Sequence, residues 1–416
     1  MQEVTRVIVV GAGVIGLGIA WELQQRGVDV VVVEPDGVGL GCSAGNAGWI
    51  SPGISTPLPS PGLPMRTLRW MMKSDSPLYM KPSLQPSFLR FMFQFWRHCN
   101  ARDFTLGTAA MAALNASTMP TFDAWKAQGI EFEMHEDGLL YVGLDADGVR
   151  EMARSVNAVP TLGYGDLEVL TGSAIRDLEP ALSTRVGGAF LMHRERTVRP
   201  ETVCDGLWMA LEANGATLHV GRMIGGVVQQ GHLHQVQTSH GTVEGDAVVI
   251  ATGAWLGQTT ELIGVKLPIQ AGKGYSVTSA YTGTLPKHPL DVMEASMAIT
   301  PFDGALRFAG TMELSGINLQ MRPERVEAIR RGAATFLHDV TPGETQDVWV
   351  GMRPLTPDGL PVIGKLAALD NVYVAGGHQM LGVTLAAATA HNLARQIVEG
   401  TPPVELLAFS PARFGA

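Results

Sequence analysis

The first 36 residues constrain the fold most, because they combine a glycine motif with the pattern of a strand, a helix and a second strand. Residues 6–10 (RVIVV) are apolar and rich in β-branched side chains, GAGVIG follows at 11–16, and a helical pattern continues to Arg26. A second apolar run, VDVVVVE, ends at Glu34, 18 residues after Gly16 (34 − 16). This order predicts a Rossmann-type βαβ unit.

Each residue of this motif has a physical role at a dinucleotide. Gly11 permits the tight turn, Gly13 lets the backbone approach a pyrophosphate, and Gly16 lets the helix pack against the strand. The helix N-terminus favours the phosphates, and the carboxylate of Glu34 can accept from ribose hydroxyls, which disfavours NADP. The motif alone does not separate FAD from NAD. The expected binding residues here are Gly11, Gly13, Val14, Ile15, Gly16 and Glu34.

Composition narrows the class of protein. The chain has 416 residues, of which 46% are hydrophobic and 17% are charged, and its net charge is −9 with no long basic run. A globular protein without a nucleic-acid partner is therefore expected. The three cysteines are odd in number and widely spaced, which argues against a disulfide framework and against a metal site. The uncharged segment at 7–21 is too short, and too rich in glycine, to span a membrane.

Three further segments suit a large flat cofactor. Residues 41–53 (GCSAGNAGWISPG) predict a backbone-lined wall, in which Ser43 and Asn46 can donate hydrogen bonds. The strand within DAVVIATGAW (246–255) should end at a sheet edge where ligands bind. The strand at 372–375 leads through GGH to a helix beginning near Gly382, whose N-terminus can stabilise negative charge on a reduced flavin.

The order of these motifs, together with KGYSV at 273–277 and GMRPLTPDGLPVIG at 351–364, resembles the FAD-dependent D-amino-acid oxidase superfamily. The likeness is greatest to bacterial D-amino-acid dehydrogenases, including D-hydroxyproline dehydrogenases, and covers nearly the whole chain. It implies an α/β fold (α+β overall) with a doubly wound Rossmann-type FAD domain and a discontinuous substrate domain with a mixed β-sheet and added helices. The expected boundaries are 1–60, 148–260 and 350–416 for the FAD domain, and 61–147 and 261–349 for the substrate domain.

The resemblance also implies a set of FAD-binding residues beyond the first motif. FAD is expected to be bound without a covalent link, because no cysteine follows Cys204 to form the link seen in some relatives. The further residues are Ser43, Asn46, Ala47, Gly48, Val228, Thr252, Gly253, Trp255, Gly377, Leu381, Gly382, Val383 and Thr384.

Arg353, Tyr275 and His378 are the expected catalytic residues. The family places an arginine such as Arg353 against the α-carboxylate of the substrate, and a guanidinium suits this role because it pairs with a carboxylate through two hydrogen bonds. The alternative is a structural ion pair with Asp358. Tyr275 and His378 are expected to line the pocket, with a strand tyrosine and a turn histidine as alternatives. Lys273 could approach the flavin, but it is interpreted as a solvated lysine. Arg307 and Glu313 are interpreted as a structural pair.

The resemblance implies oxidative deamination of D-amino acids, with proline-like ones such as D-hydroxyproline among the candidates, by transfer of the Cα hydride to flavin N5. The electrons would pass to a quinone or another respiratory acceptor. Two alternatives stay open at this point. One is an oxidase that uses O₂ on glycine, sarcosine or proline-like amines. The other is a flavin-bearing subunit of a heteromeric amine dehydrogenase.

Residues 65–102 carry seven cations, one acid and a cluster of aromatic residues, FLRFMFQFW. One interpretation is a surface that rests on an anionic membrane and meets the quinone. The other is a set of helices packed on the substrate domain, with cations reaching to solvent. The expected location is the cytoplasm, with a peripheral contact on the inner face of the cytoplasmic membrane under the first interpretation.

Overall fold

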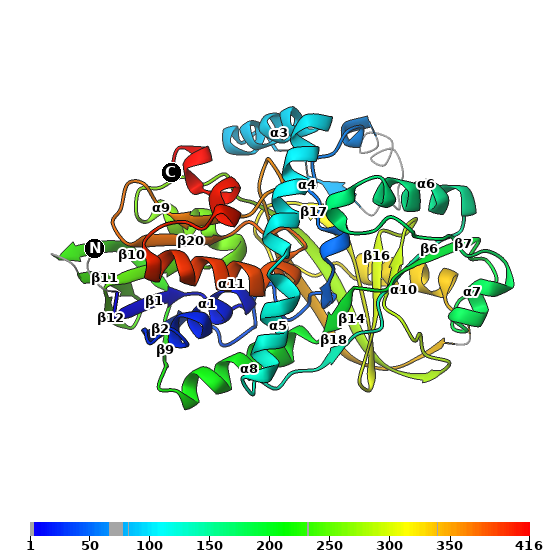
Figure 1. The fold of residues 1–416 in the computed structure, drawn as a ribbon, viewed down its shortest axis with the longest axis horizontal. Coiled ribbons are helices and arrows are strands. Elements are labelled where there is room, and N and C mark those ends of the chain that lie inside the picture. The colour runs from blue at the N-terminus through cyan, green and yellow to red at the C-terminus, as the bar shows by residue number, and fades with distance from the viewer. Residues whose placement is uncertain (1–3, 66–77, 82, 231–232, 339) are drawn as a thin grey trace.

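The computed structural model describes residues 4–65, 78–81, 83–230, 233–338 and 340–416. A six-stranded sheet forms one half of the molecule, at the left of Figure 1. Five of its strands are parallel and β19 is antiparallel to β20. Their order across the sheet is β19 (Val362–Lys365), β20 (Val372–Gly376), β13 (Ala247–Ile250), β1 (Arg6–Val10), β2 (Asp29–Glu34) and β9 (Thr217–Val220).

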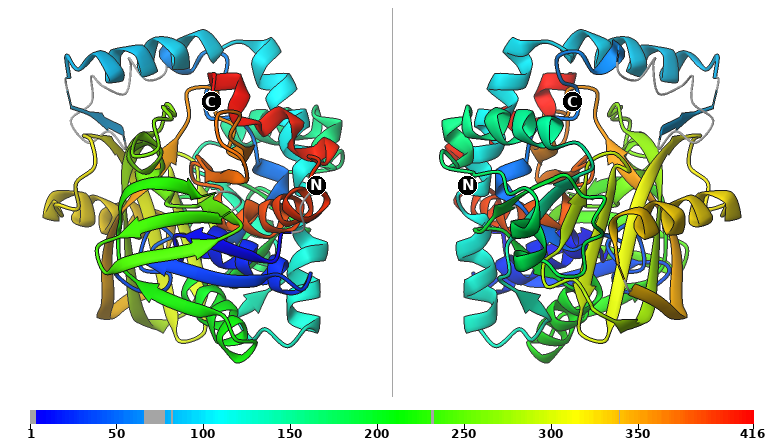
Figure 2. Two further views of the ribbon diagram at one scale, coloured as in Figure 1. Left: turned by 90° about the vertical axis from the view of Figure 1, so that its left-hand side faces the viewer. Right: turned by 90° about the vertical axis from the view of Figure 1, so that its right-hand side faces the viewer.

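Side chains of this sheet alternate between two buried cores, because successive residues of a strand point to opposite faces. On β1, Val7 and Val9 pack against a helical layer. Ile8 and Val10 point to the other face, which a three-stranded antiparallel sheet covers (Figure 2). The helices of the first face include α1 (Val14–Gln24), α8 (Pro200–Ala213) and α11 (Gly382–Glu399), and the covering strands are β10 (Met223–Gln230), β11 (Leu233–Thr238) and β12 (Gly241–Gly245).

An eight-stranded mixed sheet forms the other half of the molecule. Seven of its strands follow one another across the sheet, and β4 (Leu78–Met80) pairs with β17 beside them. The order is β18 (Val340–Leu355), β14 (Gln270–Gly283), β17 (Ala305–Leu314), β16 (Met297–Phe302), β15 (Leu290–Val292), β6 (Leu139–Gly143) and β7 (Gly188–Met192). A small sheet links the two halves through β3 (Trp49–Ile50), β8 (Arg196–Val198) and β5 (Met134–His135).

The remaining helices surround these sheets (Figures 1 and 2). They are α3 (Pro86–His98), α4 (Ala101–Asn115), α5 (Thr118–Ala127), α6 (Ala146–Asn157), α7 (Ser173–Leu178), α9 (Leu256–Glu261) and α10 (Pro323–Phe336). Short 3₁₀ helices are η1 (Pro52–Ile54), η2 (Pro160–Leu162), η3 (Gly253–Trp255), η4 (Val404–Phe409) and η5 (Pro411–Phe414).

The expected domain boundaries remain a prediction, but several elements lie across the division from the sheet that they join. Phe122 and Trp125 of α5 belong to the core of the six-stranded sheet, although 61–147 were assigned to the substrate domain. Conversely, β7 pairs with β6 in the mixed sheet, and α6 packs on both strands. Helical packing and strand pairing between distant segments decide these memberships, and neither is visible as a change of composition.

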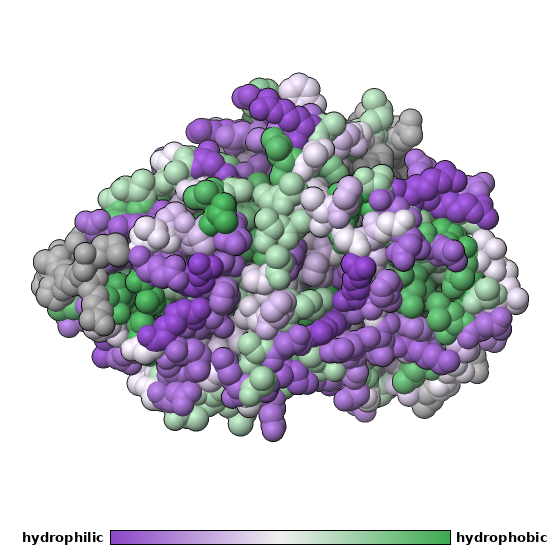
Figure 3. Space-filling model, viewed as in Figure 1, coloured by the Kyte–Doolittle hydropathy of each residue, from purple (hydrophilic) through white to green (hydrophobic). Residues whose placement is uncertain are grey.

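The described part of the chain contains no helix that is both long and apolar enough to cross a bilayer. In Figure 3, hydrophilic residues cover much of the face seen in Figure 1, with apolar clusters between them. Part of the 65–102 segment, residues 66–77 and 82, lies outside the described residues. The rest of this segment includes β4, α3 and the start of α4.

Trp125 provides a test of the packing between α5 and α1. Its ring is fully buried beside Gly18, and its Nε1–H donates to Glu22 Oε1 at 2.9 Å. Trp125→Ala should lower the free energy of unfolding by about 3–5 kcal/mol, because it leaves a large cavity and an unpaired acceptor. Trp96→Ala is the control, since that ring is 60% exposed. Denaturant unfolding measures both, and equal effects would contradict the packing described here.

Candidate active site

One large cavity, of about 1570 Å³, lies between the six-stranded sheet and the mixed sheet. It runs from the glycine motif after β1, past the loop at 40–58, to the face of the mixed sheet. Its size and length suit an extended dinucleotide together with a small substrate. The six-stranded sheet contributes the carboxyl ends of its parallel strands, which is where ligands bind in such sheets.

The glycine motif forms the end of the cavity that is suited to phosphate groups. Gly11 has φ +113°, and a Cβ there would lie 2.5 Å from the carbonyl oxygen of Ala251, so a larger residue is excluded. At Gly16 a Cβ would overlap the carbonyl of Gly11. The N-cap of α1 is Gly13, which offers no side-chain acceptor, so part of the helix N-terminus stays free for an anion.

Glu34 lies at the end of β2 and lines the same end of the cavity. Its Oε2 accepts from the Ala12 N–H at 2.8 Å, which orients the carboxylate and leaves acceptor capacity for ribose hydroxyls. Burial raises the pKa of Glu34, although two backbone N–H donors act against this shift.

The loop at 41–53 lies between the two sheets. It is hydrogen-bonded to α11 on one side and to β17 of the mixed sheet on the other. Thr384, in the first turn of α11, donates to the Trp49 carbonyl at 2.8 Å and accepts from the Ser51 N–H at 3.2 Å. On the other side, Arg307 donates to the carbonyls of Ala44 and Asn46, both at 2.9 Å. The N-terminus of α11 therefore faces the cavity in a fixed position and has no side-chain cap.

Arg353 lies on β18 and lines the cavity. Its Nη1 donates to the Thr311 carbonyl at 2.7 Å, and its guanidinium lies over Gly274, where a Cβ would overlap it. Thr311 itself has φ +60°, which residues other than glycine rarely adopt. Burial lowers the pKa of Arg353 to about 10, so the group is still charged at neutral pH.

No carboxylate of the described residues lies within 4.0 Å of the Arg353 guanidinium. The alternative partner considered from the sequence, Asp358, pairs instead with Arg413 at 2.7 Å. A cation in this position without a protein counter-ion is costly, unless a ligand supplies the negative charge.

Tyr275 does not line the cavity. On β14, Gly274 faces Arg353, so Tyr275 points to the opposite face of the sheet and packs in the core with Phe308. Its hydroxyl donates to Glu313 at 3.3 Å. The expected role of Tyr275 at the substrate is therefore not supported by its position, because a single residue of register decides which face a strand side chain meets.

Two structural interpretations from the sequence are also changed. Lys273 is buried, not solvated, and its Nζ lies 3.0 Å from Glu313 Oε2. Arg307 and Glu313 do not form a pair with each other. Glu313 binds Lys273 and Arg325, while Arg307 forms an ion pair with Glu201. Arg307 and Glu313 are held in ion pairs, as expected, but their partners are Glu201, Lys273 and Arg325.

His378 lines the cavity and is buried in the loop before α11. Its Nε2 lies 3.0 Å from Thr389 Oγ1, and its Nδ1 has no hydrogen-bond partner in the described structure. Burial lowers the pKa of His378 to about 3, so the ring is neutral at physiological pH. It can contribute a neutral donor or acceptor at the cavity wall, but not a positive charge.

Most of the expected cofactor residues meet in this cavity, whereas Gly16, Gly48 and Gly377 support its walls from behind. Val228 belongs to β10, but its side chain lies outside the described structure. Arg222, Met223 and Trp349 also line the cavity and were missed from the sequence. The lining residues among the expected cofactor residues are Gly11, Gly13, Val14, Ile15, Glu34, Ser43, Asn46, Ala47, Thr252, Gly253, Trp255, Leu381, Gly382, Val383 and Thr384.

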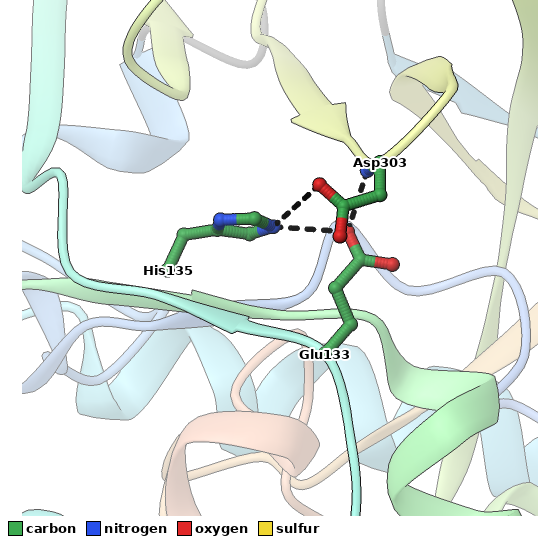
Figure 4. Close-up of side chains that lie close together, drawn as sticks. All are labelled: Glu133, His135 and Asp303. Carbon is green, nitrogen blue, oxygen red and sulfur yellow. Dashed lines mark hydrogen bonds and ion pairs between the residues drawn. The ribbon is translucent and has the colours of Figure 1, made fainter.

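A separate group of Glu133, His135 and Asp303 has ligand atoms within 4.8 Å of one another (Figure 4). His135 Nε2 lies 3.0 Å from Glu133 Oε1 and 3.8 Å from Asp303 Oδ1. Glu133 Oε1 also accepts from the Asp303 N–H at 2.7 Å, and its Oε2 lies 3.6 Å from Arg199. These hydrogen bonds and ion pairs connect the small sheet to the turn after β16. We therefore interpret the group as structural and assign no metal to it.

Comparison with known protein families matches residues 6–396 to the family described as FAD dependent oxidoreductase. The chain belongs to this family. Two D-amino acid dehydrogenases, from Rhizorhabdus wittichii and Neisseria meningitidis, are each 29% identical to it. The first alignment covers 96% of this chain and 98% of the relative, and the second covers 95% and 96%.

Solved structures confirm the expected fold. Glycine oxidase from Geobacillus kaustophilus matches with a TM-score of 0.76 at 23% identity, covering 98% of both chains. L-proline dehydrogenase from P. horikoshii matches with a TM-score of 0.71 at 19% identity, covering 100% of this chain and 98% of the other. The predictions of the family, of a two-part α/β fold and of FAD as cofactor are confirmed, and the protein is an FAD-dependent oxidoreductase.

The cavity fits FAD on its own evidence. The glycines of the first motif leave no room for side chains beside the α1 N-terminus, and Glu34 keeps acceptor capacity at the end of β2. At the other end, the uncapped N-terminus of α11 and the loop at 41–53 supply backbone groups. The three cysteines are free thiols.

His378 predicts how stability depends on pH. Its folded pKa of about 3 lies below the unfolded value near 6.5, so the unfolded state binds a proton first as pH falls. Below about pH 6.5 this group should therefore remove up to about 1.4 kcal/mol of stability per pH unit. His378→Gln should show a shallower loss between pH 7 and 5 than the parent in denaturant unfolding. Equal slopes would mean that the ring is not buried in its neutral form.

Proposed function

We propose that the protein oxidises D-amino acids to imino acids, which hydrolyse to 2-oxo acids and ammonia. The observation that carries this proposal is the Arg353 guanidinium, which is charged, faces the cavity and has no carboxylate partner among the described residues. The α-carboxylate of an amino acid is the ligand that such a group binds best. The two D-amino acid dehydrogenase relatives support the choice of substrate class.

The residues around Arg353 favour orientation of the substrate. Gly274 gives the guanidinium room, and the Thr311 carbonyl fixes its direction, so the carboxylate would be held in one place. Bound FAD supplies a two-electron acceptor for the hydride on Cα. The neutral ring of His378 adds no charge that would compete for the carboxylate.

We further propose that the electrons pass to a membrane quinone, and that α3 is the surface that contacts the membrane. Phe88 and Phe91 of this helix are buried on its inner face, whereas its Leu89, Phe93 and Trp96 are 50–60% exposed. Arg90 and Arg97 are exposed on the same helix, which suits an anionic lipid surface. Phe91, Met92, Phe95 and Trp96 also line the cavity, so an apolar passage leads inward from this surface.

Anaerobic flavin reduction tests the reaction. The purified protein is mixed with D-alanine, D-proline, their L-forms, sarcosine and glycine while the 450-nm band is followed. We expect bleaching by the D-forms only. Air is then admitted with or without a quinone analogue. Fast recovery only with the quinone supports the dehydrogenase, fast recovery in air with peroxide supports an oxidase, and no bleaching by any amine contradicts the proposal.

Arg353→Lys tests the assignment of the carboxylate partner. Lysine keeps the charge but loses the planar fork, so kcat/KM for a D-amino acid should fall by about 100-fold, mostly through KM. Arg331→Lys is the matched control, because Arg331 is exposed on α10 and forms a surface pair with Glu327. Steady-state kinetics and the affinity for a simple carboxylate inhibitor measure the effect. Unchanged values in Arg353→Lys would exclude this residue as the clamp.

A further inference from the structure

A carboxyl group that the reaction does not use faces the same cavity. Asp291 on β15 and Tyr141 on the neighbouring strand β6 are register partners, and both line the cavity. The Tyr141 hydroxyl donates to the Asp291 carboxylate. None of the described basic side chains lies within 4.0 Å of this carboxylate. Burial raises the pKa of Asp291 to about 7, as expected for an acid that lacks a counter-ion.

The strand register connects Asp291 to the part of the sheet that carries Arg353. Pairing across β15, β16, β17, β14 and β18 places five residues in one row on the cavity face. Asp291, Ala298, Ala309 and Trp349 line the cavity, whereas Ser276 is buried, so the small side chains of Ala298 and Ala309 leave room beside Asp291. The row reads Asp291, Ala298, Ala309, Ser276 and Trp349.

The strand register places Asp291 and the carbonyl that holds Arg353 at a spacing that suits a long amino acid. Asp291 lies two strands from Ala309, and Thr311, whose carbonyl binds Arg353, lies two residues further along β17. With strands about 4.8 Å apart and a rise of about 3.3 Å per residue, the backbone positions of Asp291 and Thr311 are about 12 Å apart. An extended lysine-like chain spans about 7 Å from carboxylate to tip, and a hydrogen bond of about 3 Å at each end brings this to about 13 Å.

The lobe of the cavity next to Asp291 suits an aliphatic stem. Met152 and Val156 of α6, with Leu162 and Trp49, line the cavity and belong to the same apolar cluster as Tyr141, the partner of Asp291. Methylene groups gain free energy when they leave water for such a wall, while a charged tip needs the opposite charge at the end. Asp291 is the carboxylate at that end of the row.

We propose that Asp291, oriented by Tyr141, determines specificity by binding the cationic side-chain tip of a basic D-amino acid, while Arg353 binds its carboxylate. This inference rests on the proposed function for the identity of the substrate. The presence of a cation subsite opposite Arg353 does not depend on turnover. The subsite therefore has its own test by equilibrium binding.

The binding test uses the FAD-loaded protein and two carboxylates that lack the α-amine, 6-aminohexanoate and hexanoate. They differ in the terminal ammonium group, and their dissociation constants are read from the perturbed flavin spectrum. The parent should bind 6-aminohexanoate about 10- to 100-fold more tightly. Asp291→Asn should abolish this preference and leave the affinity for hexanoate within about twofold. Asp347→Asn, on the exposed part of β18, should behave as the parent.

A second variant covers the case in which Asp291→Asn fails to fold or to retain FAD. Tyr141→Phe keeps the ring that stacks on Phe190 at 4.9 Å and removes only the hydroxyl. It should reduce the preference for 6-aminohexanoate severalfold, because the carboxylate loses the donor that orients it. A parent without the preference, or variants that retain it in full, would overturn the proposal.

Anaerobic reduction by D-lysine and by D-norleucine separates this inference from the proposed function. Bleaching by both at equal efficiency would refute the subsite and leave D-amino acid oxidation standing. An Asp291-dependent preference for 6-aminohexanoate without bleaching by any D-amino acid would refute the proposed function and support the subsite. Faster reduction by D-lysine that is lost in Asp291→Asn would support both.

Discussion

The structure depends on a single buried guanidinium that joins its two halves. Arg307, on β17 of the mixed sheet, donates to the Ala44 and Asn46 carbonyls of the loop at 41–53. It also donates to the Thr278 hydroxyl and forms an ion pair with Glu201 of α8. A buried charge is costly unless its donors are satisfied, so the folded state is favoured when these partners come together. These contacts hold the loop at 41–53 between the two sheets and thereby help to set the shape of the site.

Arg307 and Arg353 lie on the same face of the same sheet but have opposite functions, and the difference is the presence of a protein counter-ion. Arg307 has Glu201 and three further acceptors, so most of its N–H groups and its charge are already paired within the protein. Arg353 has one carbonyl acceptor, from Thr311, and faces the cavity. Counting partners of buried charges therefore separates structural arginines from binding arginines more clearly than sequence position does.

The sequence predicted local units well where pattern and function coincide. The first βαβ unit, the helix beginning at Gly382 and the residues lining the nucleotide end all follow from short-range signals, because turns, caps and apolar runs are local. The same reasoning failed at Tyr275, which lies in a long strand whose two faces are both buried. An apolar strand that is buried on both faces carries no alternation of polarity to say which face meets the site.

The sequence by itself determined a Rossmann-type unit and an FAD-dependent family, and it singled out Arg353 as a candidate site residue, since each rests on residues that are adjacent along the chain. Only the tertiary structure decided that Arg307 pairs with Glu201, that Lys273 is buried, and that Asp291 shares a cavity with Arg353. The physical reason is that counter-ions, burial and strand register are set by contacts between segments far apart in sequence. The free energy that selects them comes from packing the whole sheet, not from any local preference.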